Sequence, residues 1–372
     1  MSGATIAVLG GYGAVGAVAV DRLTGAATEL RVGGRDLDAA GALCARLGGP
    51  AAAHRVDLTD EVSLAAFCAG ADVVLNCAGP SYRVLDSVAR AARAAGARYV
   101  DVAGDEPLLR RVRATDSPDA PAAVVSAGVL PGLTGVLPAL LLADDEDPAA
   151  VRLELHVGGA ARITPVSAVD VLLATGPEFG TSLAAWRDGA ITRGALSPRW
   201  HTRVPGFSGV VHALPYLTTE VADVAAARGI GEVRQFSVYV SERVPTVLAT
   251  AWAEDPEDPT GWAGVLAEAA DADVAERGRH YALTLRRFDG DEPTAEVSVH
   301  TRDPYELSGV VAALTVRALL DQESLHGAHP ARDVLDPIAT WHALTADPLC
   351  DTGGAPLVAG RGAHDPAADA LR

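Results

Sequence analysis

A glycine-rich turn close to the N-terminus constrains the fold of this chain more than any other feature. The turn follows a short apolar run at residues 5–9 and precedes an apolar, helical segment at residues 14–23. A strand, a tight glycine turn and a helix in this order are typical of a βαβ unit that binds a dinucleotide, because bare backbone can approach a pyrophosphate. Backbone N–H groups at the start of the helix then hold the negative charge. We therefore expect the pyrophosphate of a dinucleotide at Gly10, Gly11, Tyr12, Gly13, Ala14, Val15 and Gly16.

The rest of the first 130 residues repeats this alternation of strand and helix. Apolar runs at residues 29–32, 54–56, 72–76, 99–102 and 122–126 are separated by helical patterns. Such repetition, every roughly 20–30 residues, predicts a doubly wound parallel sheet. After residue 138 the chain carries longer strands with period-2 alternation at residues 151–157, 234–240, 280–287 and 295–301, with helical segments such as 180–186 between them. We predict an α/β protein in which an α+β second domain with a mixed or antiparallel sheet follows the first.

Residues at the ends of the predicted strands suggest how a dinucleotide is selected. Arg35 follows the second strand, where its guanidinium can pair with a 2′-phosphate, so we favour NADP over NAD. The neighbouring Asp36 either caps the next helix or reaches the ribose itself. Asp57 follows the third strand and either caps a helix or bonds the adenine amino group. Small residues after the fourth strand would let the nicotinamide ribose lie against the backbone; these are Cys77, Ala78, Gly79 and Pro80.

The charged residues exclude several classes of function. All 30 basic residues are arginine, so Schiff-base lysines, Walker A lysines and the Tyr-x3-Lys pair of short-chain dehydrogenases are impossible. A net charge of −18 disfavours nucleic acid and anionic membranes as partners. The uncharged stretch 122–143 is interrupted by proline and glycine, which argues against a membrane span. The four cysteines are scattered and no metal-ligand spacing is visible, so we expect no metal and a cytoplasmic protein.

Several segments resemble the saccharopine dehydrogenase-like family of NAD(P) oxidoreductases. They are the glycine turn, the Gly34-Arg35 pair and residues 76–80, 99–105 and 127–133, with looser similarity at residues 180–182 and 335–337. The resemblance implies a Rossmann domain over residues 1–130 and a substrate or dimerisation domain over residues 131–330. It also implies a segment at 331–360 that returns to the first domain, and we expect residues 361–372 to be disordered. Hydride would move between nicotinamide C4 and a C=N or conjugated C=C carbon.

Candidate catalytic residues follow the fourth and fifth strands, at the sheet edge where ligands bind. Tyr82 is either a proton donor to substrate or a packed aromatic residue, and Asp105 either relays a proton or makes a loop hydrogen bond. Many members of the family carry Glu where this chain has Asp105. Candidate substrate-binding residues are Pro131, Gly132, Thr181, His201 and Tyr216.

These observations support three hypotheses about function. The first is an NADPH-dependent biosynthetic reductase of an imine or an activated C=C bond in a small metabolite. The second is an NAD(P)-dependent dehydrogenase of an amino-acid-derived secondary amine, although the middle of the chain lacks a clear polar cluster for such a substrate. The third is a catalytically silent dinucleotide-binding regulatory protein. Alternating strands in the second domain could also form the interface of a homodimer.

Overall fold

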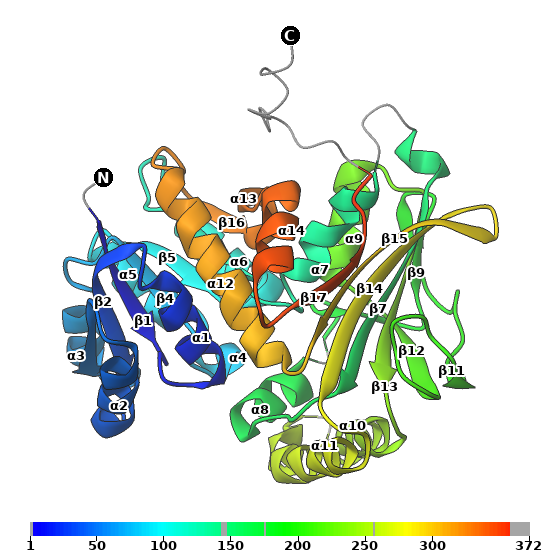
Figure 1. Ribbon diagram of the computed structural model, residues 1–372, viewed down its shortest axis with the longest axis horizontal. Coiled ribbons are helices and arrows are strands. Elements are labelled where there is room, and N and C mark those ends of the chain that lie inside the picture. The colour runs from blue at the N-terminus through cyan, green and yellow to red at the C-terminus, as the bar shows by residue number, and fades with distance from the viewer. Residues whose placement is uncertain (1–2, 143–146, 175, 256, 358–372) are drawn as a thin grey trace.

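The first domain is built on a seven-stranded sheet in which every pair of neighbouring strands is parallel. The computed structural model describes residues 3–142, 147–174, 176–255 and 257–357 and places two domains side by side (Figure 1). The strand order reverses between β1 and β4, which is the crevice where doubly wound sheets bind ligands. In order across the sheet the strands are β16 (Ala328–Pro330), β6 (Ala123–Val125), β5 (Arg98–Asp101), β4 (Val73–Asn76), β1 (Ala4–Leu9), β2 (Ala27–Gly34) and β3 (Ala51–Arg55).

Helices cover both faces of this sheet, and the central strands are apolar on both sides for that reason. In β1, Ile6 and Val8 belong to the core on one face, whereas Ala7 and Leu9 belong to the core on the other. Strands buried on both faces give continuous apolar runs rather than alternation, as residues 5–9 do. The covering helices are α1 (Ala14–Leu23), α2 (Leu37–Leu47), α3 (Glu61–Cys68), α5 (Ser87–Ala94), α6 (Asp105–Arg113) and α12 (Pro304–Asp321).

The second domain contains a ten-stranded mixed sheet. Strand β7 pairs parallel with β13 and antiparallel with β14, which confirms the predicted α/β architecture with a mixed second sheet. The main path of the sheet is β10 (Ala190–Thr192), β9 (Ala185–Arg187), β13 (Glu232–Tyr239), β7 (Arg152–Ala160), β14 (His280–Asp289), β15 (Glu292–Thr301) and β17 (Asp351–Gly354). Beside this path lie β12 (Val211–Thr218), β11 (Arg199–Thr202) and β8 (Gly180–Ser182).

Helices α8 (Pro165–Leu173), α10 (Arg243–Glu254) and α11 (Ala263–Arg277) lie together at the lower edge of the view in Figure 1. They share an apolar core of their own that includes Leu172, Leu248 and Leu266. Helix α9 (Thr219–Arg228) follows β12 and packs against β8, β12 and β13. The helix predicted at residues 180–186 is wrong, because this segment forms strands β8 and β9, which pair with β12 and β13.

The C-terminal part of the chain joins the two domains. Helix α12 packs on α1, and the absence of a side chain at Gly309 permits this approach, since a Cβ there would lie 2.6 Å from the Val15 carbonyl oxygen. Strand β16 then pairs with β6, whereas β17 pairs with β15 of the second sheet. Of the expected return segment 331–360, the structure describes residues 331–357, which form α13 (Ala331–Val334), α14 (Pro337–Ala346) and β17; strand β16 precedes the segment. The expected tail at 361–372 lies outside the described residues.

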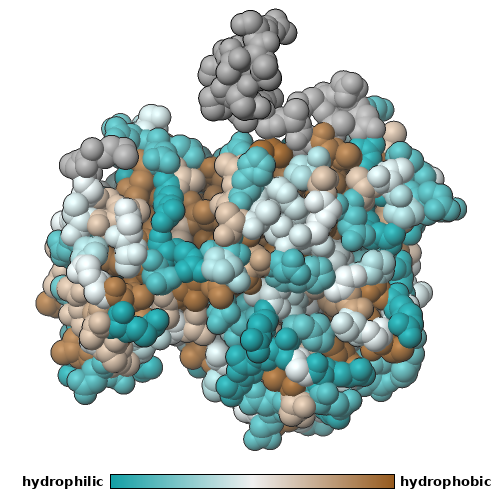
Figure 2. Space-filling model, in the orientation of Figure 1, coloured by the Kyte–Doolittle hydropathy of each residue, from teal (hydrophilic) through white to brown (hydrophobic). Residues whose placement is uncertain are grey.

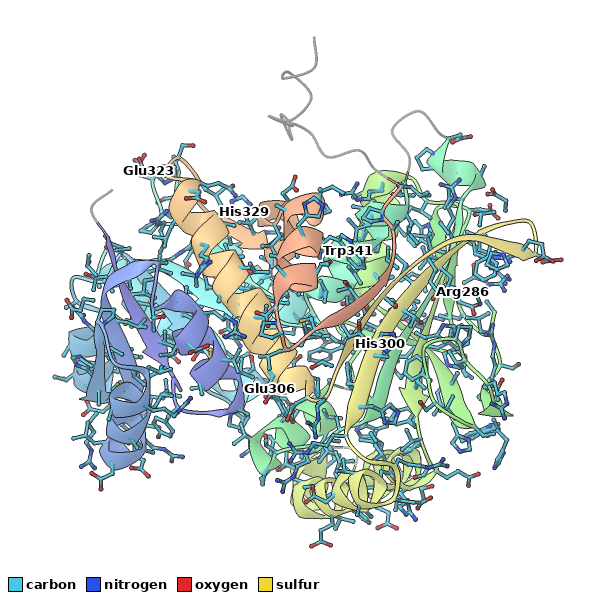
Figure 3. All side chains as sticks on the ribbon, viewed as in Figure 1. Arg286, His300, Glu306, Glu323, His329 and Trp341 are labelled. Atoms are coloured by element: carbon cyan, nitrogen blue, oxygen red, sulfur yellow. The ribbon has the colours of Figure 1, made fainter. Side chains whose placement is uncertain are left out.

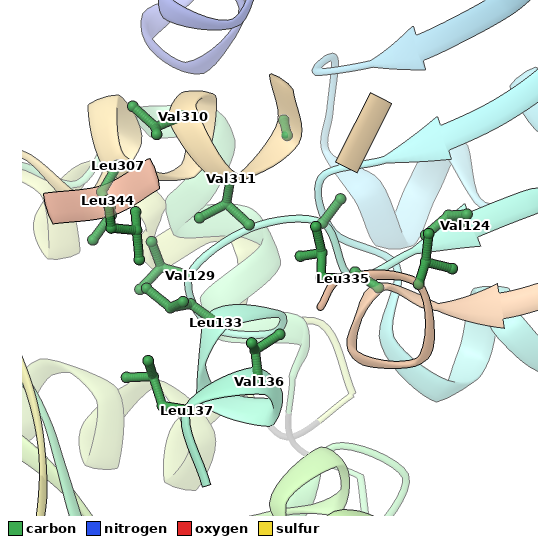
Figure 4. Close-up of a cluster of buried hydrophobic side chains, with 14 of the residues drawn as sticks. Val124, Val129, Leu133, Val136, Leu137, Leu307, Val310, Val311, Leu335 and Leu344 are labelled. Carbon is green, nitrogen blue, oxygen red and sulfur yellow. The ribbon is translucent and has the colours of Figure 1, made fainter. Parts of the chain in front are cut away.

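A buried apolar cluster connects these elements (Figure 4). It brings together Val124 of β6, Leu133 and Leu137 of the segment that leaves the first domain, Val311 of α12 and Leu344 of α14. In Figure 3, Trp341 lies on α14, and Arg286 and His300 lie on the neighbouring strands β14 and β15. Within the part of the chain that the structure describes, no helix has the length and apolar character needed to cross a membrane.

Candidate active site

A cleft of about 1800 Å³ separates the carboxyl edge of the first sheet from the second domain. Figure 2 shows a notch between the two domains at the lower edge of this face. The loops that follow β1, β2, β3, β4 and β5 line one wall, and residues of α8, β12 and α10 line the other. Ligand sites of drug-sized molecules typically occupy about 300–1,000 Å³, so this cleft has room for a dinucleotide and a second molecule.

The glycine turn has the geometry that a pyrophosphate site requires. A Cβ at Gly16 would lie 2.3 Å from the Gly10 carbonyl oxygen, and a Cβ at Gly10 would lie 2.9 Å from the Ala78 nitrogen. Gly10 also has φ of +70°, which favours glycine. No side chain in the described residues caps α1, whereas Asp36 caps α2 and Asp60 caps α3. The first N–H groups of α1 are therefore not used by a side-chain cap, and the turn fits a dinucleotide.

The predicted cofactor residues divide into those that line the cleft and those that shape it. Gly11 and Gly16 do not line the cleft. They lie behind its wall, where the lack of a side chain lets the turn pack closely against the neighbouring strands and helix α1. The residues that line the cleft are Gly10, Tyr12, Gly13, Ala14, Val15, Arg35, Asp57, Cys77, Ala78, Gly79 and Pro80.

The end of β2 presents a cation to the cleft. Arg35 is exposed, and the described residues offer its guanidinium no ion pair. Asp36 is engaged as the N-cap of α2, since its carboxylate accepts from the Ala39 N–H at 3.0 Å, and its own N–H donates to the Tyr12 hydroxyl at 3.0 Å. Of the two interpretations left open for Asp36, the structure thus shows the cap.

Asp57 lies near Arg35 across the end of the sheet. Its Oδ1 accepts from the Thr59 N–H at 2.9 Å and from the Thr59 hydroxyl at 2.8 Å. These two hydrogen bonds hold the pKa of Asp57 below its ordinary value, with a smaller contribution from the charge of Arg35. Asp57 is therefore a carboxylate at neutral pH and remains on the wall of the cleft.

The loop after β4 is supported by a buried polar network. Asn76 donates from Nδ2 to Asp101 at 2.9 Å and accepts from the Ala78 N–H at 3.1 Å. The Tyr99 hydroxyl and the Ala103 N–H also donate to Asp101. Burial raises the pKa of Asp101, although these donors oppose the shift. Asp101 thus holds the loops after β4 and β5 in place.

Cys77 lies in this loop but has no feature of a nucleophile. Burial raises the pKa of its thiol, and the negative charge of Asp101 raises it further. A reactive cysteine needs a lowered pKa, because the thiolate is the nucleophile. Cys77 therefore contributes shape to the cleft wall rather than reactivity.

Tyr82 and Asp105 meet in the cleft at the carboxyl edge of the first sheet. The Tyr82 hydroxyl donates to Asp105 Oδ2, and both residues line the cleft. Desolvation, together with the charges of Glu220, Asp170 and Asp101, raises the pKa of Asp105 to about 7. Burial and the carboxylate of Asp105 raise the pKa of Tyr82 well above its ordinary value. Tyr82 thus stays neutral, and the carboxyl group beside it changes its protonation near neutral pH.

A carboxylate from the second domain holds Tyr82 in position. Asp170 of α8 accepts from the N–H groups of Ser81 at 3.0 Å and of Tyr82 at 3.1 Å. These are the first residues of α4 (Ser81–Val84), so the acceptor caps this short helix from the other domain. The Tyr82 ring also packs edge-on against Phe179, with ring centroids 4.7 Å apart. Sequence reasoning missed both Asp170 and Phe179, because nearly 90 residues separate Asp170 from the residues it holds.

The predicted substrate residues have different positions. Pro131, Thr181 and Tyr216 line the cleft. Gly132 lies behind the wall, where its N–H donates to buried Glu220 at 2.9 Å. Burial and the charge of Asp105 raise the pKa of Tyr216 to about 12, so this hydroxyl also stays neutral.

His201 does not line the cleft. It lies on β11, where its Nε2 is 3.7 Å from Glu242 Oε1 and its ring meets that of His212 with centroids 4.7 Å apart. The potential ligand atoms of His201, His212 and Glu242 all lie within 4.8 Å of one another, so these side chains could hold a metal ion. Their spacing in the sequence gave no sign of this grouping. The His201 N–H, however, donates toward His212 Nδ1 at 3.5 Å, which occupies one of the nitrogens a metal would need.

Comparison with known proteins supports the resemblance seen in the sequence. Residues 6–124 match the family described as saccharopine dehydrogenase NADP binding domain. The apo histidine-tagged saccharopine dehydrogenase (L-Glu forming) of Saccharomyces cerevisiae is similar over 95% of this chain and 100% of its own, with a TM-score of 0.63 and 16% identity. Residues 6–124 are therefore similar to this NADP-binding family, and the fold of the whole chain is shared with the yeast enzyme.

Other solved structures resemble only part of the chain. Uronate dehydrogenase from Agrobacterium tumefaciens is 26% identical over 28% of this chain and 41% of its own, with a TM-score of 0.24. A variant of actinorhodin polyketide ketoreductase with NADPH is 17% identical over 33% of this chain and 69% of its own, with a TM-score of 0.28. No curated protein matches the sequence.

Proposed function

We propose that this protein is an NADPH-dependent reductase that delivers hydride to the carbon of an imine or of a conjugated C=C bond in a small metabolite. The observation that carries the proposal is the Tyr82–Asp105 pair at the carboxyl edge of the sheet, beside the loop at residues 77–80. A neutral hydroxyl backed by a carboxyl group with a pKa of about 7 is suited to donate a proton near neutral pH. The match to an NADP-binding family supports the choice of cofactor.

The residues of the chain divide the chemistry between them. NADPH, when bound, supplies the hydride. The Tyr82 hydroxyl donates its proton to the imine nitrogen, or to the carbon adjacent to an activating carbonyl in an enoyl compound. Protonated Asp105 then returns a proton to the Tyr82 oxygen, so that one proton leaves Asp105 for each substrate reduced. Asp170 keeps the tyrosine in place through the two backbone N–H groups it accepts from.

Because the chain contains no lysine, no ammonium group can lie beside the tyrosine; a carboxyl group lies there instead. In the Tyr-x3-Lys arrangement, a nearby positive charge favours ionisation of the tyrosine. Here the neighbour of Tyr82 is a carboxyl group, which raises the tyrosine pKa instead. A tyrosinate is therefore disfavoured, and Tyr82 is suited to pass on a proton while remaining a hydroxyl.

We propose NADP rather than NAD because of the contrast between Arg35 and Asp36. Arg35 is exposed at the end of β2, where a guanidinium can form charge-assisted hydrogen bonds to a 2′-phosphate. The Asp36 carboxylate is already engaged as a helix cap. A fluorescence titration with NADPH and NADH, repeated for Arg35→Ala, tests this choice. The exposed Arg46 at the end of α2 is not part of the cleft wall, so Arg46→Ala is a matched control.

The alternative functions make different predictions. A dehydrogenase for an amino-acid-derived secondary amine needs a cation for the substrate carboxylate, and the second-domain wall offers only the exposed Arg193 among its described residues. A catalytically silent regulator would bind NADPH and reduce nothing. Loss of NADPH absorbance with a panel of cyclic imines and 2-enoyl thioesters supports the reductase. Binding of NADPH without oxidation by any member of the panel, or oxidation only with carboxylated imines, contradicts it.

The homodimer expected from the alternating strands is also part of the proposal. Three large apolar side chains are exposed on or beside the outer strands of the second sheet: Ile191 of β10 at 45%, Trp200 of β11 at 48%, and Val210, just before β12, at 39%. Exposed apolar side chains of this size are suited to an interface between protein chains. We expect light scattering to give the mass of a dimer and Trp200→Glu to give that of a monomer; a monomeric wild-type protein would contradict this expectation.

A further inference from the structure

The wall that the second domain presents to the cleft is mostly apolar, and most of its polar side chains are uncharged hydroxyls, at Thr164, Ser167, Thr181, Ser182, Thr218 and Ser237. Helix α10 turns one stripe toward the cleft, with Val244, Leu248 and Trp252 spaced four residues apart. Helix α8 adds Val166 and Val171. Further apolar or aromatic residues of this wall are Ile163, Pro177, Phe179, Leu214, Pro215, Tyr216, Tyr239, Pro245 and Tyr305.

Part of this apolar surface is open to solvent. Val166 is 46% exposed and Trp252 is 38% exposed, and Leu130 on the opposite side of the cleft is 41% exposed. Large apolar side chains that gather around one concave site, rather than lying singly over the surface, indicate a ligand that covers them. Trp252 also donates from Nε1 to the Leu172 carbonyl oxygen at 3.0 Å, which fixes α10 against α8.

Near Tyr82, the charges of the cleft disfavour an anionic substrate. The arginines that line the cleft, Arg35, Arg83 and Arg193, are all exposed, and Arg83 is engaged by Thr260 and Asp258. Among the described residues that line the second-domain wall, Asp170 and Arg193 are the charged ones. Asp170 lies beside Tyr82 and adds negative charge where the reacting atoms would be, while Arg193 is exposed just beyond the edge strand β10. A carboxylate near Tyr82 would face Asp101, Asp105 and Asp170 without a buried guanidinium, which is electrostatically unfavourable.

We propose that the substrate carries a long, uncharged apolar group, of the fatty-acyl or alkyl type, which lies in the cleft along the apolar residues of α8 and α10 while its C=N or C=C carbon lies at Tyr82. This inference rests on the proposed function for the reacting end of the molecule, but the apolar wall itself can be tested without turnover. The size of the cleft, about 1800 Å³, accommodates such a group beside a dinucleotide. The substrate of a saccharopine-type reaction, with its several carboxylates, does not fit this wall.

Isothermal titration of the NADP⁺-loaded protein tests the proposal with unreactive probes. The probes are the saturated N-acetylcysteamine thioesters of butanoate and decanoate, with glutamate as the charged comparison. Each additional buried CH₂ strengthens binding roughly fourfold, so burial of about three of them makes the decanoyl probe about 50-fold tighter. We expect no measurable binding of glutamate. Equal affinities for the two thioesters, or tighter binding of glutamate, would overturn the proposal.

Two variants of helix α10 test whether the decanoyl probe binds at this wall of the cleft. Ala249 lines the cleft and is exposed, so Ala249→Asp places a charge on the wall at little cost to folding. Thr246 is exposed on the same helix but does not line the cleft, and Thr246→Asp is the matched control. We expect Ala249→Asp to weaken the decanoyl probe at least about tenfold, as desolvation of an unpaired charge requires, and Thr246→Asp to leave it unchanged. Equal effects of both variants would contradict the assignment of this wall.

A titration with NADPH distinguishes failure of the proposed function from failure of the proposed substrate class. If the protein fails to bind NADPH at all, the proposed function fails. If NADPH binds normally in the wild type and in Ala249→Asp, but chain length has no influence on the thioesters, only the substrate class is wrong.

Discussion

Replacement of Asp105 by asparagine tests the proposed proton relay most closely. Asparagine has nearly the same shape, and Asp105 has φ of +39°, a left-handed conformation that Asp and Asn both tolerate. The variant should therefore fold normally and keep the hydrogen bond to Tyr82, but it cannot supply a proton. Any loss of rate then reports on acid catalysis.

The magnitude follows from the pKa of Asp105. The cleft raises that pKa from 3.8 to about 7. At pH 7 about half of the Asp105 side chains carry a proton, compared with roughly one in a thousand for an ordinary aspartate. General acid catalysis contributes about 10²–10⁴-fold in enzymes, and we expect Asp105→Asn to lower kcat for reduction by about 10²–10³-fold.

The pH dependence provides a second readout with a defined sign. The protonated form of Asp105 supports reduction, and its fraction declines as pH rises through about 7. Wild-type kcat for reduction should thus be level at lower pH and fall about tenfold per unit above pH 7. In Asp105→Asn, kcat should be low and without this transition.

The assay is stopped-flow oxidation of NADPH with the best substrate of the panel. Glu106→Gln is the matched control, because Glu106 is the next residue, pairs with Arg110 at 3.7 Å and does not line the cleft. We expect this control to keep the wild-type rate and profile. A kcat within about twofold of wild type in Asp105→Asn, with the transition near pH 7 retained, would refute the relay.

Three further changes test the cofactor site and its support. Arg35→Ala should weaken NADPH by about 10–100-fold and NADH little, since a hydrogen bond to a charged group contributes about 1.5–3 kcal/mol; equal losses for both would contradict the 2′-phosphate contact. Gly16→Ala should abolish NADPH binding in a titration, because its Cβ would lie 2.3 Å from the Gly10 carbonyl oxygen, and normal affinity would show that the turn lies elsewhere. Glu220→Ala leaves the buried Gly132 N–H without its acceptor and should lower the free energy of unfolding in urea by about 1–3 kcal/mol. An unchanged urea midpoint would show that the loop finds another partner.

The first domain could be predicted from the sequence because its signals are local. The glycine turn, the apolar run of β1 and the cap at Asp36 are each decided by residues that lie next to one another in the chain. The carboxyl ends of parallel strands meet at one edge, so Tyr82 and Asp105 could both be placed at this edge from the sequence. The hydrogen bond between them is a finding of the structure.

The secondary structure of the second domain was harder to predict from the sequence, for a physical reason. Residues 180–186 have a helical pattern, but pairing of β8 with β12 and of β9 with β13 overrides it. The three short strands β9, β10 and β11 carry too few residues to show an alternation. The contact of Asp170 with the backbone of Tyr82 could not be predicted from nearby residues in the sequence, and neither could the position of His201 outside the cleft. Both depend on how segments that are distant in the chain pack together.

A crystal structure of the complex with NADP⁺ would show whether this cleft binds the cofactor in the proposed orientation. We expect the pyrophosphate at the start of α1 and the 2′-phosphate at Arg35. We expect the nicotinamide ring to lie against residues 77–80, with C4 facing the space beside the Tyr82 hydroxyl. A nicotinamide ring that points away from Tyr82 and Asp105, or a dinucleotide bound outside this cleft, would contradict this expectation.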